Sequence, residues 1–526
     1  MSPIETLFGL LVAVAALTWL AQRIGVEYPI LLVVGGLVLG FIPGLPRVEL
    51  QPDVVFLLFL PPLLYYEAFN SSVRDFRPLL RLITLNAVFL VIVTIAAVAL
   101  VTHALIPDLP WPAAVVLGAI VGPTDETAAI AIASRLRVPR RLVTLIKAES
   151  LFNDATSLVI FNVALVAAVT GTFSWAAGVW QLFIDAIGGA AIGLAVGWFV
   201  GLVRRNVDDP LLQNTISLLS GYAAYYPADA LHLSGVLAAI TAGLFLGRQT
   251  YSITSATSRV QITAMREITL FLINGLLFIL VGLQLRPILV GLSGAESPGS
   301  LIAMAAAVSF TVIAVRLLWA FPAAYLPAAI SPKIRAAEGK PSWKNVTVAA
   351  WTGLRGGISL AAALAVPLTI ANGAPFPHRD LILFLTFAVI LATLVGQGLT
   401  LPVLIRALGI TAESAEREEA LARLRATRAA RAALERLAQE PWADPAIVRD
   451  VREHLKKAAA HHRATRDQTL TSDQTKSASA ARRIRHELNE AQSREIVRLR
   501  DEGAINDETV RKIQRELDLE TVRDGT

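Results

Sequence analysis

The stretch ESLFND, residues 149–154, places two acids and two further polar side chains inside an apolar segment long enough to cross a bilayer. An ionisable group at the bilayer centre costs about 2.5–3.5 kcal/mol, so such groups are paired, hydrated or functional. In a helix, Glu149 and Asn153 share one stripe, and Ser150 and Asp154 share the next. The second stripe offers a hydroxyl and a carboxylate, which are hard oxygen ligands suited to a small cation.

The same apolar character extends through most of the chain. The 526 residues are 55% hydrophobic and 17% charged, with a mean hydropathy of +0.58. This composition excludes a disordered chain and argues against an ordinary soluble enzyme. Because a span needs about 20 mainly apolar residues, we predict an all-α membrane protein with about thirteen transmembrane helices. They lie near residues 4–21, 29–44, 53–69, 80–105, 112–134, 142–169, 176–203, 211–226, 232–247, 262–284, 300–328, 345–370 and 380–405.

The charged residues divide the chain in two. Residues 1–410 hold 43 of the 88 charged side chains, and residues 411–526 hold the other 45. We therefore predict a transmembrane domain over 1–410 and a soluble helical tail over 411–526. The net charge of +6 is accordingly no argument for nucleic-acid binding. The absence of cysteine excludes disulfides, thiolate metal sites and cysteine nucleophiles.

Basic residues in the predicted loops test this count of spans. With the N-terminus outside, the loops on one side carry sixteen Lys and Arg residues, whereas the opposite loops carry only Arg47, Arg286 and Arg379. Such an asymmetry marks the cytoplasmic side of membrane proteins. The sequence thus predicts a multi-pass protein of the inner cell membrane with a cytoplasmic tail.

Two of the predicted spans are interrupted. The fifth contains Gly-Pro-Thr-Asp at residues 122–125, and the twelfth contains Gly-Leu-Arg-Gly-Gly at residues 353–357. The two breaks occupy equivalent places if spans 1–6 and 8–13 form two inverted six-helix repeats. Broken helices in corresponding places mark the binding sites of transporters built from such repeats. The alternative is a pair of harmless Gly/Pro kinks, which membrane helices tolerate.

Two acids lie at or near the first break. Asp154 has no cation on its own helix face, so it is either a ligand of a small cation or a buried protonated acid bonded to Ser150. Asp125 either caps the second half of its broken helix or also shapes a cation site. The Thr124 hydroxyl and the carbonyls freed by the break would supply further oxygen ligands to such a site.

Other ionisable residues also fall within predicted spans, and four of them suggest a role. We interpret Glu149 and Arg316 as an ion pair, because Arg316 is otherwise unpaired in the eleventh span. Arg355 is expected to neutralise the helix ends at the second break rather than bind substrate. Glu67 lies after a Pro-Pro pair and either lines an ion entrance or pairs locally.

A set of short motifs resembles one transporter family. The sequence Glu149-Ser150-Leu151-Phe152-Asn153-Asp154-Ala155-Thr156 is similar to the sixth-helix signature of the monovalent cation/proton antiporters that include the NhaP-type and sodium/proton-exchanger proteins. The order and spacing of the other motifs support the resemblance over about residues 5–406. They are Leu60-Pro61-Pro62 with Glu67, Pro123-Thr124-Asp125, Ser234-Gly235, Asn274 to Gln284, Arg316, Gly353-Leu354-Arg355-Gly356 and Gln397 through Pro402.

The resemblance implies a fold with crossed broken helices and a core domain that moves against a dimerisation domain in a homodimer. It implies that Asp154 holds the monovalent cation and the proton in turn, with Asn153 marking the electroneutral branch. Thr124, Asp125 and Ser150 would complete or shape the cation site, and no cofactor is expected. Glu149, Asn153 and Arg316 would form a neighbouring cluster that steadies the sixth helix. Glu126 departs from the family pattern, because many relatives have a small or apolar residue there.

The sequence therefore predicts exchange of Na⁺ or Li⁺ for H⁺ by alternating access, with one cation traded for one proton. Potassium/proton exchange is the alternative within transporters. Two remote alternatives remain open at this stage. One is a membrane-embedded aspartyl protease in which Asp125 and Asp154 share a proton, and the other is a channel or receptor that reuses the fold with its tail as a sensor.

Overall fold

The computed structural model describes residues 3–42, 52–136, 138–171, 175–254, 256–292, 297–332, 334, 341–410, 413–440 and 442–466, together with scattered residues beyond 466. The chain forms two compact units, residues 1–411 and 412–526. Throughout the described ranges the regular structure is helical, with one isolated bridge between Thr369 and Pro375. The predicted all-α class is confirmed.

The first half of the membrane unit contains six of the predicted spans, two of them divided into shorter helices. They are α1 (Pro3–Ile24), α2 (Tyr28–Phe41), α3 (Pro52–Phe69), the run α4 (Val73–Phe76), η1 (Arg77–Leu79), α5 (Leu80–Thr84), η2 (Leu85–Leu90) and α6 (Val91–Leu105), the pair α7 (Trp111–Val121) and α8 (Glu126–Arg135), and α9 (Arg140–Thr170). The element η2 is a π-helical turn within the fourth span.

The second half contains the remaining spans, some of which are again divided into shorter helices. They are α10 (Trp175–Arg205), α11 (Pro210–Ala230), α12 (Gly235–Ile253), α13 (Ala256–Leu283), followed by α14 (Leu285–Gly291), α15 (Pro298–Ile330), the pair α17 (Trp343–Trp351) and α18 (Gly357–Leu364), and the run α19 (Arg379–Leu391), η3 (Ala392–Gln397) and α20 (Gly398–Leu408). The element η3 is a second π-helical turn.

Each of the thirteen predicted spans thus coincides with a helix, a run of helices or a broken pair. Among the described residues, eight helical stretches are long and apolar enough to cross a membrane, and α2 is a shorter apolar helix. The twelfth span ends at Leu364 and not near residue 370. Pro367 accounts for the early end, because proline disfavours the helical conformation in the residue before it.

Local sequence explains where several helices begin. Asp209 caps α11, with Pro210 in its first turn, by accepting a hydrogen bond from the Leu211 N–H at 2.9 Å. Ser234 caps α12 by accepting one from the Leu237 N–H at 3.2 Å. Short polar side chains at these positions satisfy amides that have no partner within the helix.

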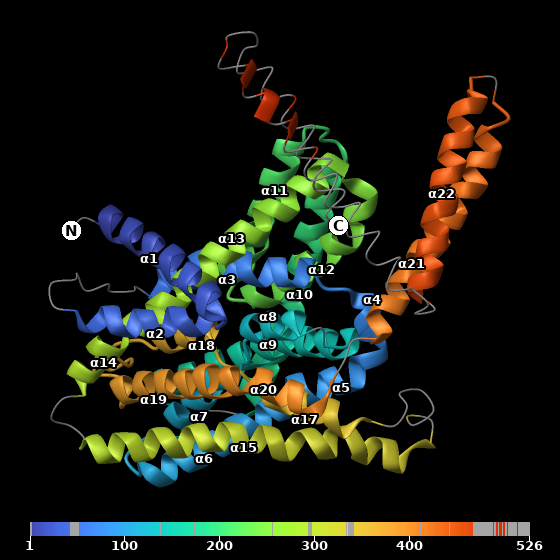
Figure 1. Ribbon diagram of the computed structural model, residues 1–526. Coiled ribbons are helices and arrows are strands. Elements are labelled where there is room, and N and C mark those ends of the chain that lie inside the picture. The colour runs from blue at the N-terminus through green and yellow to red at the C-terminus, as the bar shows by residue number, and fades with distance from the viewer. Residues whose placement is uncertain are drawn as a thin grey trace. The chain divides into compact units, whose positions relative to one another are not determined.

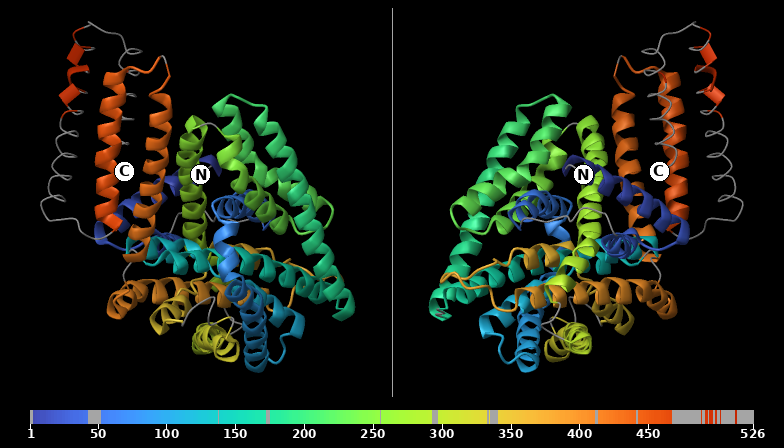
Figure 2. Two further views of the ribbon diagram at one scale, coloured as in Figure 1. Left: turned by 90° about the vertical axis from the view of Figure 1, so that its right-hand side faces the viewer. Right: turned by 90° about the vertical axis from the view of Figure 1, so that its left-hand side faces the viewer.

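The helices of the membrane unit form two groups, seen from three sides in Figures 1 and 2. The first group comprises α1, α2, α3 and α10–α13, with close contacts between α2 and α13, between α3 and α12, and between α10 and α12. The second group comprises α5–α9, α15 and α17–α20, and in it α15 lies against α6 and α7 lies against α9. Both broken pairs belong to the second group.

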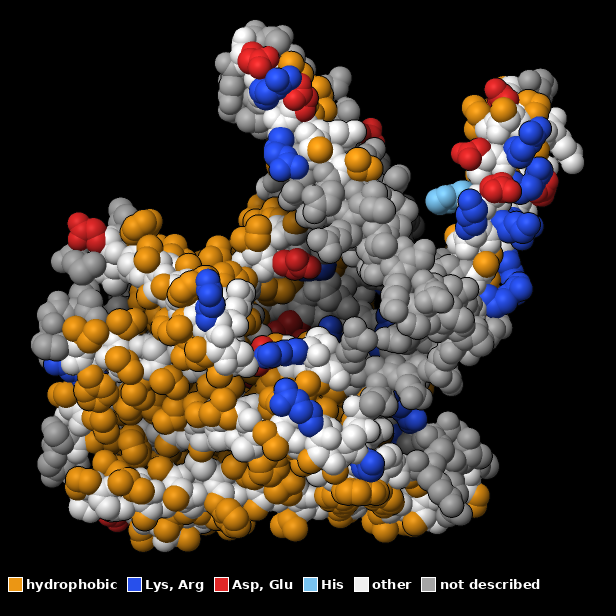
Figure 3. Space-filling view, in the orientation of Figure 1, with side chains coloured by type: hydrophobic (Ala, Val, Ile, Leu, Met, Phe, Trp, Pro, Cys, Tyr) orange, Lys and Arg blue, Asp and Glu red, His pale blue; other side chains and the backbone are white. Residues whose placement is uncertain are grey.

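Apolar side chains cover much of the outside of this unit. In Figure 3 they spread over α15, α19 and α2 with few charges among them. On α15, Phe310, Leu318 and Ile330 are each about three-quarters exposed. Large apolar surfaces of this kind are unfavourable in water, whereas lipid tails solvate them. The surface agrees with a chain that spans a membrane.

The second unit contains two charged helices, α21 (Glu413–Leu437) and α22 (Pro445–Arg466), which lie against each other. Arg452 donates two hydrogen bonds to the Glu435 carboxylate, at 2.9 and 2.8 Å. These bonds lower the pKa of Glu435. Because the pair is exposed to solvent, it contributes little to stability.

Candidate functional site

The two helix breaks meet in the interior of the second helix group. The first lies between Val121, where α7 ends, and Glu126, where α8 begins. The second lies between Trp351, where α17 ends, and Gly357, where α18 begins. The Asp125 N–H donates to the Leu354 carbonyl at 2.7 Å, so the two unwound segments are hydrogen-bonded to each other. Their backbone groups thereby gain partners that neither helix supplies.

Asp125 serves both breaks. Its Oδ1 accepts a hydrogen bond from the Thr127 N–H at 2.7 Å, which makes it the N-cap of α8. Its Oδ2 lies so close to Gly356 that a Cβ added at this glycine would be 1.6 Å away. Gly356 directly precedes α18, so the carboxylate lies near the amino-terminal ends of two half-helices. Such ends carry partial positive charge and stabilise an anion.

Arg355 plays the reciprocal part at the carboxyl-terminal ends. Its buried guanidinium donates from Nε to the Val121 carbonyl at 3.1 Å, which is the end of α7, and from Nη1 to the Gly353 carbonyl. Its backbone N–H donates to Thr393 Oγ1 at 3.1 Å. A positive charge is favourable at these ends, where carbonyls lack helical partners. Arg355 thus lies among helix ends, as the sequence indicated.

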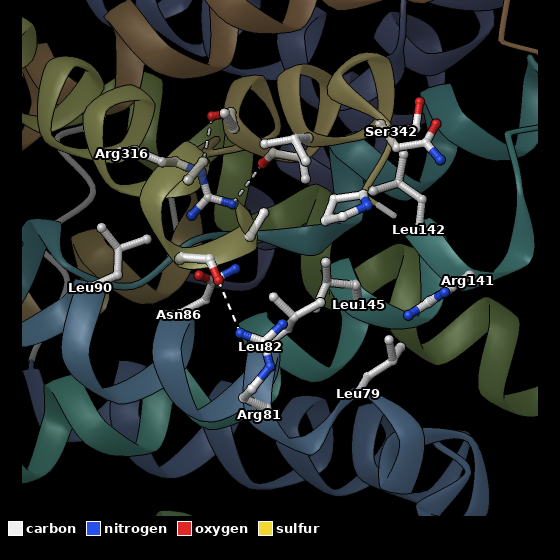
Figure 4. A pocket seen from close by; sticks show the side chains of 18 residues that line it. Leu79, Arg81, Leu82, Asn86, Leu90, Arg141, Leu142, Leu145, Arg316 and Ser342 are labelled. Carbon is white, nitrogen blue, oxygen red and sulfur yellow. Dashed lines mark hydrogen bonds between the residues drawn. The ribbon is translucent and has the colours of Figure 1, made fainter. Parts of the chain in front are cut away.

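One stripe of α9 carries a buried ion pair. Arg316 of α15 donates from Nη1 to Glu149 Oε1, and their side chains are 5% and 2% exposed. Its Nε and Nη2 donate to the Ala350 and Ala349 carbonyls at 3.1 and 3.0 Å, near the end of α17 (Figure 4). Asn86 of η2 donates to Glu149 Oε2 at 3.0 Å. The Glu149–Arg316 pair therefore connects three elements of the second group, with Asn86 adding a fourth.

A cavity of about 200 Å³ borders this ion pair (Figure 4). Its walls are mainly apolar, with Leu82, Leu90 and Leu145 among the lining residues, and Asn86 and Arg316 add polar groups to them. Asp154 does not line it. The cavity therefore belongs to the ion-pair side of α9.

The other face of α9 contacts the first break. Ser150 Oγ donates to the Thr124 carbonyl at 2.6 Å, and Asn153 Nδ2 donates to Thr124 Oγ1 at 2.7 Å. The family resemblance implies a cluster of Asn153 with Glu149 and Arg316, whereas in the structure Asn153 bonds to Thr124. A four-residue step turns a helix by about 40° beyond one full turn. That rotation lets Asn153 reach the unwound segment while Glu149 reaches α15.

Asp154 lies beside these bonded groups but shares none of their bonds. The residue is 1% exposed. Neither of its carboxyl oxygens has a hydrogen-bond partner among the residues that the structure describes. The predicted alternative, a protonated acid bonded to Ser150, is not the arrangement found, because Ser150 donates to the Thr124 carbonyl instead.

Three further ionisable residues surround this region. Glu67 of α3 is half-buried and interacts electrostatically with Glu126, Asp154 and Asp125, while Lys147 supplies an opposing positive charge. Lys147 likewise acts on Glu126. Within the described ranges, no three acidic or histidine side chains lie close enough together to hold a metal ion.

Two residues that sequence reasoning missed, Asn86 and Thr393, come from the π-helical turns. Asn86 of η2 donates a hydrogen bond to Glu149, and Thr393 Oγ1 of η3 accepts one from the Arg355 N–H. Turns of this kind occur frequently at functional sites. Tertiary packing decides where such turns occur, and no sequence pattern distinguishes a π-helical turn from the α-helix around it. The sequence offered one signal for them: Asn86 and Thr393 are polar side chains inside otherwise apolar spans.

Comparisons with known proteins identify the family and the fold. The family model described as sodium/hydrogen exchanger, transmembrane, matches residues 9–407. An uncharacterized Na⁺/H⁺ exchanger of Mycobacterium tuberculosis is 37% identical, covering 98% of this chain and 96% of that protein. A sodium, potassium, lithium and rubidium/H⁺ antiporter of Bacillus pumilus is 31% identical over 72% of this chain and 58% of its own length. The sodium proton antiporter structure from Methanocaldococcus jannaschii matches with a TM-score of 0.62 at 21% identity, covering 77% of this chain and 98% of that one.

The close approach at Gly356 leads to a first prediction. We expect Gly356→Ala to lower the free energy of unfolding by about 1–3 kcal/mol, because the added methyl group overlaps Asp125 and forces the two breaks apart. Thermal unfolding of the purified protein in detergent measures the change. Gly396→Ala is the matched control, since a Cβ there meets nothing within 4 Å. Equal unfolding temperatures for the two variants would contradict the close contact.

The buried ion pair leads to a second prediction. Arg316→Ala leaves Glu149 buried without its cation, so we expect a loss of about 3–5 kcal/mol in stability. The double variant Arg316→Ala with Glu149→Ala should lose less than the sum of the two single changes. Arg286→Ala is the control, because this exposed arginine also donates to a carbonyl, that of Gly40. Additive losses, measured by the same unfolding assay, would show that the pair is not coupled.

Proposed function

The chain belongs to the sodium/hydrogen exchanger family, and from this premise we propose how its own residues exchange a cation for a proton. It is a multi-pass membrane transporter and not an enzyme. We propose Na⁺ or Li⁺ as the transported cation and Asp154 as the group that binds it.

The observation that carries the proposal is the isolation of the Asp154 carboxyl. It is buried, and neither oxygen has a hydrogen-bond partner among the described residues. A buried ionised carboxylate without a partner is costly. Asp154 must therefore hold either a proton, which neutralises it, or a cation, which compensates its charge. The proton and the cation therefore compete for the same carboxylate, and this competition is the basis of exchange.

The neighbouring groups suit a monovalent cation. Thr124, Ser150 and Asn153 offer neutral oxygens beside a single carboxylate, and sodium prefers such hard ligands. Because Asn153 carries no charge, Asp154 is the one carboxyl of this group, and the site has the same net charge whether it holds the proton or the cation. One cation is then traded for one proton, so transport is electroneutral.

Alternating access requires the loaded site to move while the empty charged site does not. We propose that the second helix group, with both breaks and α9, moves against the first group. Support comes from the division of the helices into two groups and from the crossed breaks, which tie α8, α9 and α18 into one body. On the family resemblance, the first group would form the contact in a homodimer within the inner membrane, surrounded by lipid. Residues 411–526 would be a cytoplasmic and regulatory tail.

Potassium is the alternative cation. The relative from Bacillus pumilus is named for sodium, potassium, lithium and rubidium. A site built from one carboxylate and neutral oxygens binds all of these ions, and cavity size and flexibility decide among them. The ion series in the experiment below therefore tests both cations together.

The protease alternative predicts an acid pair that shares a proton. Asp125 instead accepts from the Thr127 N–H, and neither Asp154 oxygen has a bonded partner among the described residues. The family assignment excludes the enzyme. A channel that reuses the fold would conduct cations without moving protons, and the same experiment separates it from an exchanger.

We expect Asp154→Asn to abolish cation-dependent proton movement, because the amide can neither release a proton nor compensate a cation. Purified protein is sealed into liposomes with a trapped pH dye, a proton gradient is imposed, and Na⁺, Li⁺ or K⁺ is added in turn. The wild-type protein should dissipate the gradient with each transported ion. Clamping the membrane potential should leave the rate unchanged if exchange is electroneutral.

Asp229→Asn is the control for this measurement, because Asp229 is an exposed acid of α11 in the first helix group. It should exchange as the wild type does. Thermal unfolding establishes that both variants are folded. Undiminished exchange by folded Asp154→Asn would reject Asp154 as the carrier, and cation flux without proton movement would favour the channel.

A further inference from the structure

A second cavity of about 1100 Å³ lies away from Asp154, and we call it the arginine cavity. Its walls come from two segments: residues 69–77, which follow α3, and residues 247–266, which join α12 to α13. Its charged lining residues are Arg74, Asp75, Arg77, Arg248, Arg259 and Arg266. Five cations thus face one acid in a single hollow.

Three of the five arginines have no acidic partner within the described ranges. Among the described residues, no acid lies within salt-bridge distance of the exposed Arg74, Arg77 or Arg248 side chains. Arg259 donates to the Thr254 carbonyl, a neutral acceptor. Like charges held together in one hollow repel each other, and an anion between them would relieve that repulsion.

A further arginine lies next to this wall and is completely buried. Arg204 of α10 donates from Nη2 to Thr254 Oγ1 at 3.1 Å, so it converges with Arg259 on one residue. Its Nε and Nη1 have no hydrogen-bond partner within the described ranges, and the residue is 0% exposed. A buried guanidinium without a carboxylate adds to the positive potential beside the cavity.

The positive-inside rule alone does not account for this arrangement. It requires basic residues on one side of the membrane, and scattered loop arginines satisfy it. The rule does not require that five arginines line the same cavity. Nor does it require that Arg204 be buried within the first helix group. The cavity therefore needs a second explanation.

We propose that the arginine cavity binds a phosphate-bearing anion, either a lipid headgroup or a soluble phosphate compound. Arginine forms paired, charge-assisted hydrogen bonds with phosphate oxygens, and several arginines together suit a multiply charged group. The Ser72 hydroxyl at its wall accepts from the Asp75 N–H and so keeps its own proton as a further donor. Its volume is in the range of ligand pockets and admits a group larger than a single phosphate.

The position of the cavity gives the bound anion a role in transport. Arg248, Arg259 and Arg266 belong to the first helix group, whereas Arg74 and Arg77 lie on the segment that leads from α3 to α5 in the second group. Within the first group the end of α3 touches α12, since a Cβ at Gly247 would lie 2.2 Å from the Phe69 carbonyl oxygen, and the segment with Arg74 and Arg77 leaves from this contact. An anion that bridges both segments would restrain relative movement of the groups. This regulatory role rests on the proposed function, but the binding site does not.

Binding is tested on the full-length protein in phosphatidylcholine nanodiscs at 150 mM salt. In one arm, radiolabelled inorganic pyrophosphate is titrated by equilibrium dialysis. In the other, nanodiscs contain added phosphatidylglycerol, and the lipid retained after purification is counted by mass spectrometry. We expect saturable binding in at least one arm, weakened about tenfold by Arg74→Gln and by Arg248→Gln, since each removes one charge-assisted contact. Arg248→Lys should weaken it less, because the charge remains.

Arg406→Gln is the matched control, because Arg406 is an exposed arginine near the end of α20 and does not line the cavity. Pyrophosphate binding alone would identify a soluble ligand, and phosphatidylglycerol retention alone would identify a lipid headgroup. The proposal is overturned if neither probe binds saturably, or if Arg406→Gln weakens binding as much as the cavity variants do. Asp154→Asn should retain full binding, so that a failure of the proposed exchange mechanism is distinguished from a failure of this site.

Discussion

Four helix ends meet inside the membrane unit, and their compensation is the constraint on which the rest of the structure depends. Each end leaves backbone groups without helical partners, and lipid supplies none. Asp125 of the first break lies against the start of α18, while Arg355 of the second break binds the end of α7. Each break thus carries the charge that the other needs. Neither half of the crossing is stable alone, so the two broken spans form one structural element although more than 200 residues separate them in the chain.

Helix α9 holds this element in place from two sides. Toward α15, Glu149 pairs with Arg316, which also binds the last carbonyls of α17. Toward the first break, Ser150 and Asn153 both bond to Thr124. The same helix therefore supports one half-helix of each broken pair. A buried ion pair contributes little net stability compared with apolar packing, so we interpret Glu149–Arg316 as a device that fixes the register of α9 against the breaks.

Much of this arrangement was predictable from composition and spacing, and the remainder depends on packing. The breaks at 122–125 and 353–357 follow from Gly and Pro in apolar spans, and the Glu149–Arg316 pair follows because each charge in lipid needs an opposite one. The partner of Asn153 was misassigned, because a helical stripe does not say which neighbour it faces. Asn86 was missed because the π-helical turn that aims it at Glu149 has no distinct sequence pattern. The arginine cavity could not be predicted either. In the sequence its arginines indicate only which side of the membrane the loops face, and not that they lie close together.

The bonding around the first break is also the reason that we propose Asp154, and not a neighbouring polar group, as the exchanging residue. Ser150 and Asn153 donate to Thr124, and Asp125 accepts from Thr127, so a change in any of them breaks a bond that maintains the crossing. Asp154 can gain or lose a proton or a cation without breaking a hydrogen bond to any residue that the structure describes. In the proposed mechanism the site therefore separates two tasks: bonded residues preserve the geometry, and one buried carboxyl changes its charge. Because the bonded neighbours hold their positions, the free energy of cation binding would favour movement of the whole helix group over a local rearrangement.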